Sequence, residues 1–238
     1  MVLASTSGIL GVLLVAAAFG GSILFGKWQT LRRAEYIRTF RWPPGLLKRL
    51  EKHHPGFARK DSALVSRGLR QFFLAYLMSG KRYVSMPSQV ADDLWHEFIL
   101  YTRDYDAFCR RAFGGFLHHT PAVVLSEHRK SNEGLRRVWW YCCKYENIDP
   151  VRPTRLPLLF ALDSKLNIAN GFVYHPDCDE LRKNGSGAAY CGGDFADGSV
   201  DGSTDGFGDA GSDAGGDGGG GDGGGGGDGG GGCGGGGD

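Results

Sequence analysis

The stretch from Gln89 to Pro121, QVADDLWHEFILYTRDYDAFCRRAFGGFLHHTP, carries the strongest helical pattern in the chain. At 100° per residue, its apolar residues lie within about 40° of Leu94, and Cys109 at about 60°, so that they form a stripe about seven turns long. Such a stripe is typical of a helix packed against a core. Its members are Val90, Leu94, Phe98, Tyr101, Tyr105, Phe108, Cys109 and Ala112.

The two ends of this pattern carry the expected helix signals. Ser88 is a suitable N-cap, because its hydroxyl can accept from a free backbone amide. Arg110 and Arg111 lie in the last turn, where the helix dipole favours cations. The pair Gly114-Gly115 then stops the helix. The sequence therefore predicts one unbroken helix from the N-cap to the glycines.

Asp92 and His96 lie one turn apart on the side opposite the apolar stripe. A carboxylate in that position can orient an imidazole or join it on a metal ion. Arg103, Asp106 and Arg110 share this side, however, so a solvated charged face is the simpler interpretation. Both interpretations stay open from the sequence.

His119 is the third candidate ligand beside Asp92 and His96. It follows the two glycines, which permit a sharp turn, and it would reach the pair only if the chain crosses back toward the start of the helix. Catalytic zinc sites usually have three protein ligands and an open position. We expect no cofactor, except that these three residues could hold a divalent metal such as zinc.

The spacing Asp92-x-x-Trp95-His96, Tyr105-x-x-x-Cys109, then glycine and His119 resembles the glycine-rich domain-containing protein-like family, over roughly residues 43–178. The resemblance implies a helical domain, and the family has no settled biochemical activity. In plant-type members a second histidine often lies two residues after the first. Here Phe98 stands at that position, so one potential metal ligand is missing.

Charge divides the chain into a basic body and an acidic tail. The last 47 residues hold 26 of the 41 glycines and 10 aspartates, without a lysine or arginine. The rest of the chain holds all 27 basic residues against 16 acidic ones. The tail has almost no apolar residue to offset the entropy of ordering, so the sequence predicts a flexible segment.

The N-terminal segment predicts a single membrane span. Residues 2–26 carry no charge, and the 18 residues from Gly8 to Phe25 would extend about 27 Å as a helix, close to the thickness of the hydrocarbon layer. Basic residues follow from Lys27 on, which predicts an N-terminus outside and a domain in the cytoplasm. The alternative is a cleaved signal peptide, which would lack its usual basic start. Trp28, Tyr36 and Trp42 can lie at the lipid interface, and the arginines of this segment can face anionic lipid.

Four further helical patterns predict a mainly α fold. They cover Gly45–His54, Asp61–Ser79, Ser131–Asn147 and Leu156–Leu166, with a short strand near Tyr174 that is too small to form a sheet.

The six cysteines form no C-x-x-C pair, which predicts reduced thiols. The expected parts are a transmembrane anchor (1–26), a basic juxtamembrane segment (27–42), a compact multi-helix domain (43–191) and a disordered Gly/Asp-rich tail (192–238).

Two functions remain from the sequence. The first is a membrane-anchored protein with a cytoplasmic helical interaction module, whose partners are the lipid bilayer and a protein bound through the domain or the tail. The second is a metal-dependent or acid/base enzyme that uses Asp92, His96 and His119. No H-E-x-x-H, phosphate loop or dinucleotide motif supports the enzyme, and the basic residues lack a nucleic-acid-binding motif.

Overall fold

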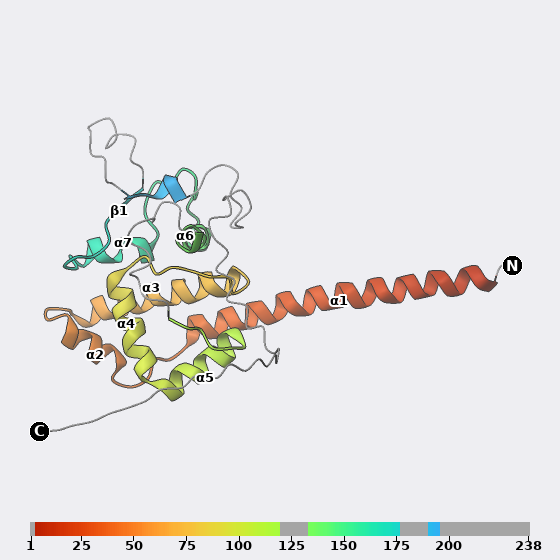
Figure 1. The fold of residues 1–238 in the computed structure, drawn as a ribbon, viewed down its shortest axis with the longest axis horizontal. Helices are drawn as coiled ribbons and strands as arrows, with labels where there is room; N and C mark the ends of the chain where they lie inside the picture. The colour runs from red at the N-terminus through yellow and green to blue at the C-terminus, as the bar shows by residue number, and fades with distance from the viewer. Residues whose placement is uncertain (1–2, 120–132, 177–189, 196–238) are drawn as a thin grey trace, which may run out of the picture. The chain divides into compact units, whose positions relative to one another are not determined.

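The computed structural model describes residues 3–119, 133–176 and 190–195. The chain divides into a unit Met1–Phe207 and a unit Gly208–Asp238, and the second unit lies outside the described residues, as does the tail from residue 196 on. The described part is mainly helical, as the sequence predicts (Figure 1). Its elements are α1 (Leu3–Thr39), α2 (Leu46–His53), α3 (Arg59–Met78), α4 (Gln89–Leu100), α5 (Thr102–Phe113), α6 (Glu133–Tyr145), α7 (Leu158–Lys165), β1 (Tyr174–His175), β2 (Tyr190–Cys191) and the 3-10 helix η3 (Gly192–Phe195).

Helix α1 runs without a break from the apolar segment into the helical core (Figure 1). Its part Gly11–Thr39 is long and apolar enough to cross a membrane, a property that a signal sequence shares. The apolar side chains between Val12 and Phe25 are exposed, unlike those of a buried core helix. Ala34 and Ile37 are fully buried, so the packed core takes in residues before position 43, where we expected the helical domain to begin.

Aromatic residues at the end of α1 pack against protein. Tyr36 and Trp42, which we expected near lipid, both lie against the core, whereas Trp28 is exposed. The guanidinium group of Arg70 lies 4.8 Å from the Trp42 ring and donates to the Phe40 carbonyl at 2.7 Å. Because Arg70 belongs to α3, these contacts fix the end of α1 to that helix. Our expectation for Tyr36 and Trp42 was therefore wrong.

Helix α3 lies at the centre and contacts α1, α2, α4, α6 and α7 (Figure 1). Gly68 permits the close approach of α7, because a Cβ atom there would come within 2.5 Å of Leu162. The core is rich in aromatic rings that pack edge to face, an arrangement that ring quadrupoles favour. The largest fully buried side chains are Trp139, Tyr105, Phe72, Phe73, Phe98, Phe108, Phe113, Phe160 and Phe195.

The predicted long helix is two helices, which corrects the expectation of an unbroken one. Tyr101 has φ −82° and ψ 60°, and it ends α4 and begins α5. The two helices run in different directions from this point (Figure 1). Because only one residue is non-helical, the apolar stripe keeps its phase, and Phe98 and Tyr105 are both buried. Periodicity alone therefore could not reveal the break.

The C-terminal part of the domain differs from expectation in two ways. β1 and β2 pair in parallel, with Tyr174 opposite Tyr190, so two very short strands do form a sheet. Cys191 is disulfide-bonded, which contradicts the prediction of reduced thiols throughout, although Cys109, Cys142 and Cys143 are free. Spacing along the sequence could not show this, because a disulfide depends on which residues the fold brings together.

Residues 192–195 form the 3-10 helix η3, although the composition assigns them to the tail. Phe195 is only 1% exposed and packs against the rings of Trp139, Phe160 and Tyr174. The burial of this one aromatic side chain fixes the turn to the core. The composition does not predict it, because glycine and aspartate surround Phe195 in the sequence.

Candidate metal centre

The first turn of α4, which carries Asp92, is held by a buried carboxylate from α7. Asp163 accepts hydrogen bonds from the Ser88 hydroxyl at 2.7 Å and from the backbone amides of Gln89 at 2.7 Å and Val90 at 3.2 Å. Ser88 in turn accepts from a backbone amide of the first turn, as predicted for an N-cap. The negative charge of Asp163 suits a helix N-terminus, so α4 begins at a fixed point.

His119 reaches α4 because the chain turns back after α5. Gly114 caps α5 with φ +80°, a conformation that favours glycine. The hydroxyl of Tyr105 then donates to the Leu117 carbonyl at 2.5 Å, and the indole N–H of Trp95 donates to the Tyr105 hydroxyl at 3.1 Å. This buried chain of hydrogen bonds fixes the returning segment beside α4, two residues before His119.

Cys109 also contacts the returning segment that carries His119. Its thiol is fully buried and is hydrogen-bonded to the Leu117 backbone and the Tyr105 hydroxyl. Burial raises the pKa of the Cys109 thiol, although these hydrogen bonds partly oppose the shift. The thiol therefore packs and does not ionise near neutral pH, in agreement with the sequence interpretation of this residue as packing.

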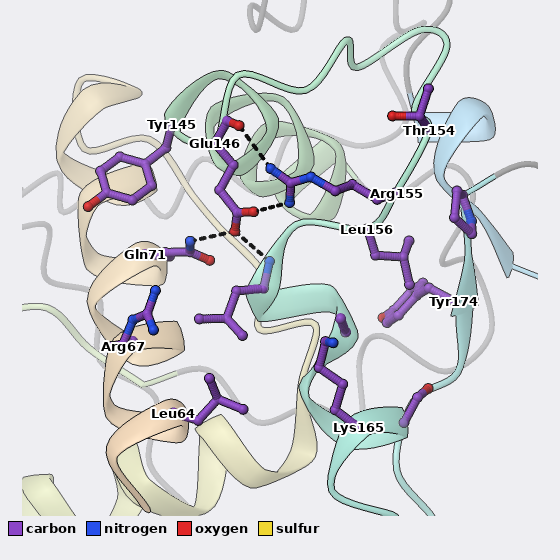
Figure 2. Close-up of a pocket in the computed structure, with 14 residues that line it drawn as sticks. Leu64, Arg67, Gln71, Tyr145, Glu146, Thr154, Arg155, Leu156, Lys165 and Tyr174 are labelled. Atoms are coloured by element: carbon purple, nitrogen blue, oxygen red, sulfur yellow. Dashed lines mark hydrogen bonds and ion pairs between the residues drawn. The ribbon is translucent and has the colours of Figure 1, made fainter. Parts of the chain in front are cut away.

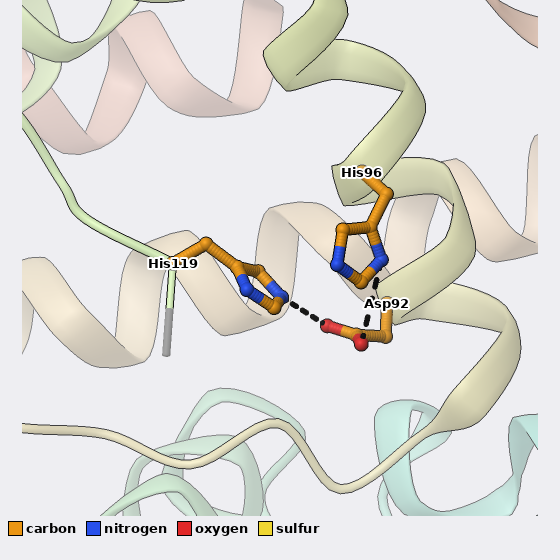
Figure 3. Close-up of side chains that lie close together, drawn as sticks. All are labelled: Asp92, His96 and His119. Atoms are coloured by element: carbon orange, nitrogen blue, oxygen red, sulfur yellow. Dashed lines mark hydrogen bonds and ion pairs between the residues drawn. The ribbon is translucent and has the colours of Figure 1, made fainter. Parts of the chain in front are cut away.

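The three predicted ligands come together, as Figure 3 shows. Asp92 Oδ1 lies 2.8 Å from His119 Nε2, and Asp92 Oδ2 lies 3.6 Å from His96 Nδ1. One donor atom of each residue lies within 4.8 Å of the other two. For a tetrahedral zinc ion with bonds of about 2.0 Å, ligand atoms stand about 3.3 Å apart, so small side-chain movements would place all three on one ion.

The site is closed on one side and open on the other. The side chains of Asp92 and His119 are 8% and 12% exposed, whereas that of His96 is 55% exposed. The ring of Trp95 packs edge-on against His119 with 4.5 Å between centroids, and the centroid of the His96 ring lies 4.2 Å from that of His119. Solvent or a ligand can therefore approach from the His96 side.

These positions correct half of the solvated-face interpretation. His96 is exposed, as that interpretation requires, but Asp92 is buried. The reason is the segment from Phe116 to His119, which covers the polar side of α4 and supplies the partner of Asp92. The periodicity of a helix cannot predict that a later segment of the chain will pack over its polar side.

Two hollows lined by described residues lie outside this site. One has a volume of about 220 Å³ and is lined by Lys81, Tyr83 and Phe116, and also by Trp95, whose ring packs against His119. The other is a groove of about 800 Å³ between α3, the end of α6, α7 and β1 (Figure 2). Sequence reasoning missed both hollows, because their linings come from segments far apart in the chain.

Glu146 organises one wall of the larger groove. It is paired with Arg155 and accepts hydrogen bonds from Gln71 at 2.8 Å and from the Leu158 amide at 2.6 Å (Figure 2). Burial by itself would raise the pKa of Glu146, but these donors together hold it below its usual value. Across the groove Arg67 and Lys165 are exposed, and the described residues offer neither an ion-pair partner.

Comparison with known families gives one match. The model of the uncharacterised UCP032817-like family matches residues 32–195. The chain belongs to this family. The match begins in the buried end of α1 and ends at Phe195, so it covers the packed core and the whole candidate site. Searches of the curated proteins and of the solved structures found no match.

Proposed function

We propose that this protein binds a divalent metal ion of the zinc type through Asp92, His96 and His119, in a helical domain that α1 tethers to a membrane. One observation carries the metal proposal. His119 lies 27 positions after Asp92, yet a hydrogen-bonded support places its ring on that carboxylate. Two imidazoles and one carboxylate are a ligand set suited to zinc and to several other divalent ions.

The same contact would also form if Asp92 and His119 were only a structural hydrogen bond that pins the returning segment. The two interpretations predict different responses to a chelator. A metal site loses stability when the ion is removed, because binding free energy contributes to folding. A hydrogen bond is indifferent to a chelator.

The test is the metal content and the thermal unfolding of the full-length protein purified in detergent. We expect about one zinc ion per chain, a lower unfolding midpoint in chelator, and loss of both properties in His119→Ala. His54→Ala is the matched control, because His54 Nε2 lies 2.9 Å from Asp93 on the same helix but that pair belongs to no three-ligand group among the described residues. Absence of bound metal, together with no effect of the chelator, would overturn the proposal.

A metal ion held by three protein ligands has a coordination position free for a reactant. Catalytic zinc sites keep one position open for water or substrate, and here the open side is that of His96. Metal-dependent or acid/base catalysis by Asp92, His96 and His119 therefore stays part of the proposal. His96→Ala separates this role from structure, since His96 is exposed and its loss should change metal affinity more than folding stability.

A second candidate function is an interaction module, which the larger groove favours. Its lining includes apolar residues such as Leu64 and Leu156, together with the exposed cations Arg67 and Lys165. An acidic protein segment would match this lining. Lys165→Glu should then weaken capture of the partner, whereas Lys60→Glu, an equal charge change away from the groove, should not.

Two observations point to opposite topologies for α1. The basic residues after the span favour a cytoplasmic domain, as the positive-inside rule requires. The disulfide at Cys191 favours an oxidising compartment, and so an exported domain or a cleaved signal sequence. We propose the cytoplasmic arrangement with an intact span. A reporter fused after Asp238 tests it, and activity of an export-dependent reporter would overturn it.

The resemblance to glycine-rich domain-containing proteins also stays a proposal. Its support is that the motif residues form one connected unit. Trp95, Tyr105 and Cys109 hold the segment that carries His119, and His119 meets the first motif residue, Asp92.

A further inference from the structure

Three segments of the chain meet where α1 leaves the domain. The Phe113 carbonyl at the end of α5 accepts a hydrogen bond from Arg33 of α1 at 3.1 Å and from Lys81, just after α3, at 3.3 Å. The end of α3 and the end of α5 therefore flank the point at which α1 continues toward its apolar part (Figure 1).

These three segments form a surface that is basic throughout. Residues 27–33, 78–83 and 110–116, which we call the basic face, contain seven arginines and lysines and no acidic residue. Lys81 and Arg82 are exposed, as are Arg110 and Arg111, although Arg110 pairs with Asp106 one turn earlier. A surface of one sign this dense attracts anions over about a Debye length.

The basic face also carries exposed apolar side chains. Aromatic rings beside cations are typical of the interface between lipid and water, where a ring inserts among headgroups and a cation meets phosphate. The exposed apolar residues of the basic face are Trp28, Leu31, Met78, Tyr83 and Phe116.

The length of α1 sets the height of this surface above a membrane. Phe25 ends the apolar run, and Arg33 follows eight residues later on the same helix, which is about 12 Å. The polar layer of a bilayer extends roughly 5–8 Å beyond the hydrocarbon on each side. The remaining gap is within reach of arginine and lysine side chains, and it is shorter than the Debye length of about 8 Å.

We infer that the basic face lies against anionic lipid headgroups, so that the domain is docked on the bilayer surface and not only tethered to it. This inference rests on the proposed membrane span of α1. It fixes the direction of α3, whose C-terminal end, three residues before Lys81, faces the lipid. Its start, at Arg59 and Lys60, is about 30 Å away along the helix.

Lys81 and Lys60 provide an internal comparison, because both are exposed and they lie at opposite ends of α3. The full-length protein would be placed in nanodiscs of phosphatidylcholine, with or without about one third phosphatidylglycerol. A water-soluble acylating reagent would then be added, and mass spectrometry would give the rate at each lysine. We expect Lys81 to react at least about threefold more slowly with the anionic lipid, because its surface potential holds the amine protonated. The rate at Lys60 should not change.

Charge reversal tests whether the basic face causes this difference. Arg82→Glu should reduce the lipid dependence at Lys81, whereas Arg59→Glu, the same change at the far end of α3, should leave it intact. Equal rates at Lys81 in both lipids would overturn the docking inference while the span stands. A chain that does not remain with the nanodiscs after an alkaline wash would overturn the span and the docking together.

Discussion

Asp92 and its neighbours show how single residues of α4 acquire their roles from distant parts of the chain. Asp92 lies opposite the apolar stripe, yet it is 5% exposed, because the segment ending at His119 covers it. Tyr105 makes this possible. Its position on the apolar stripe predicts burial, but only the structure shows that its hydroxyl joins Trp95 to Leu117. The sequence thus predicts the candidate ligands but not the support that unites them.

Replacing Tyr105 with phenylalanine tests this support. The ring stays in the core, but the buried Trp95 N–H and Leu117 carbonyl lose their shared partner. We expect unfolding to become easier by about 1–3 kcal/mol, the usual cost of an unsatisfied buried polar group. If a metal binds, its affinity should fall about 10–100-fold, as for other residues that orient a ligand. Chemical denaturation and zinc titration measure the two effects.

Tyr101→Phe is the control, since within the described residues the Tyr101 hydroxyl makes only a long hydrogen bond of 3.4 Å, to the Pro44 carbonyl. Its removal should change stability by no more than about 0.5 kcal/mol. Equal effects of the two substitutions would contradict the role of Tyr105.

At the scale of elements, the helices were predictable but their junctions were not. Apolar periodicity predicts α2, α3, α6 and α7 to within a few residues, because each helix buries one face against the same core. The break at Tyr101 and the start of α4 depend on tertiary contacts. The start of α4 needs Asp163, which lies more than 70 positions away and looked in the sequence like an ordinary polar residue of a short helix.

Asp163→Ala should therefore destabilise the fold strongly. The buried carboxylate accepts from the Ser88 hydroxyl and from three backbone amides, including that of Phe172 at 2.9 Å. Loss of several charge-assisted hydrogen bonds should cost more than about 3 kcal/mol. Asp149→Ala, which removes one exposed bond to the Val151 amide, should cost less than about 1 kcal/mol. Urea denaturation of both variants measures the difference.

The junction of α6 and α7 predicts a dependence on pH. The pKa of Glu146 is lowered in the folded state, because its hydrogen-bond donors outweigh the effect of burial. A lowered carboxyl pKa stabilises the fold above the unfolded-state pKa of about 4.5, and this stabilisation is lost as the pH falls through the folded-state value. The advantage of wild type over Glu146→Gln should be full at pH 7 and shrink below about pH 4.5. An advantage that grows toward low pH would contradict this assignment.

At the scale of the whole molecule, composition located the change from a basic body to a Gly/Asp-rich tail but placed the boundary a few residues early. Gly192 and Phe195 are buried, and a Cβ atom on Gly192 would come within 2.2 Å of the Trp139 ring. The family match also ends at residue 195. A count of glycines could not detect this, since the one aromatic residue that packs is surrounded by tail-like sequence.

Two truncations locate the boundary by experiment. Removal of residues 196–238 should leave the thermal midpoint almost unchanged, because this segment has very few apolar residues with which to form a core. Removal of residues 192–238 also takes away Phe195, a buried phenylalanine whose loss should cost about 3–5 kcal/mol. For a chain of this size that lowers the midpoint by roughly 6–20 °C. Phe195→Ala in the full-length protein should reproduce most of this drop. If instead the shorter truncation lowers the midpoint as much as the longer one, residues beyond 195 contribute to the fold, and the boundary at Phe195 is wrong.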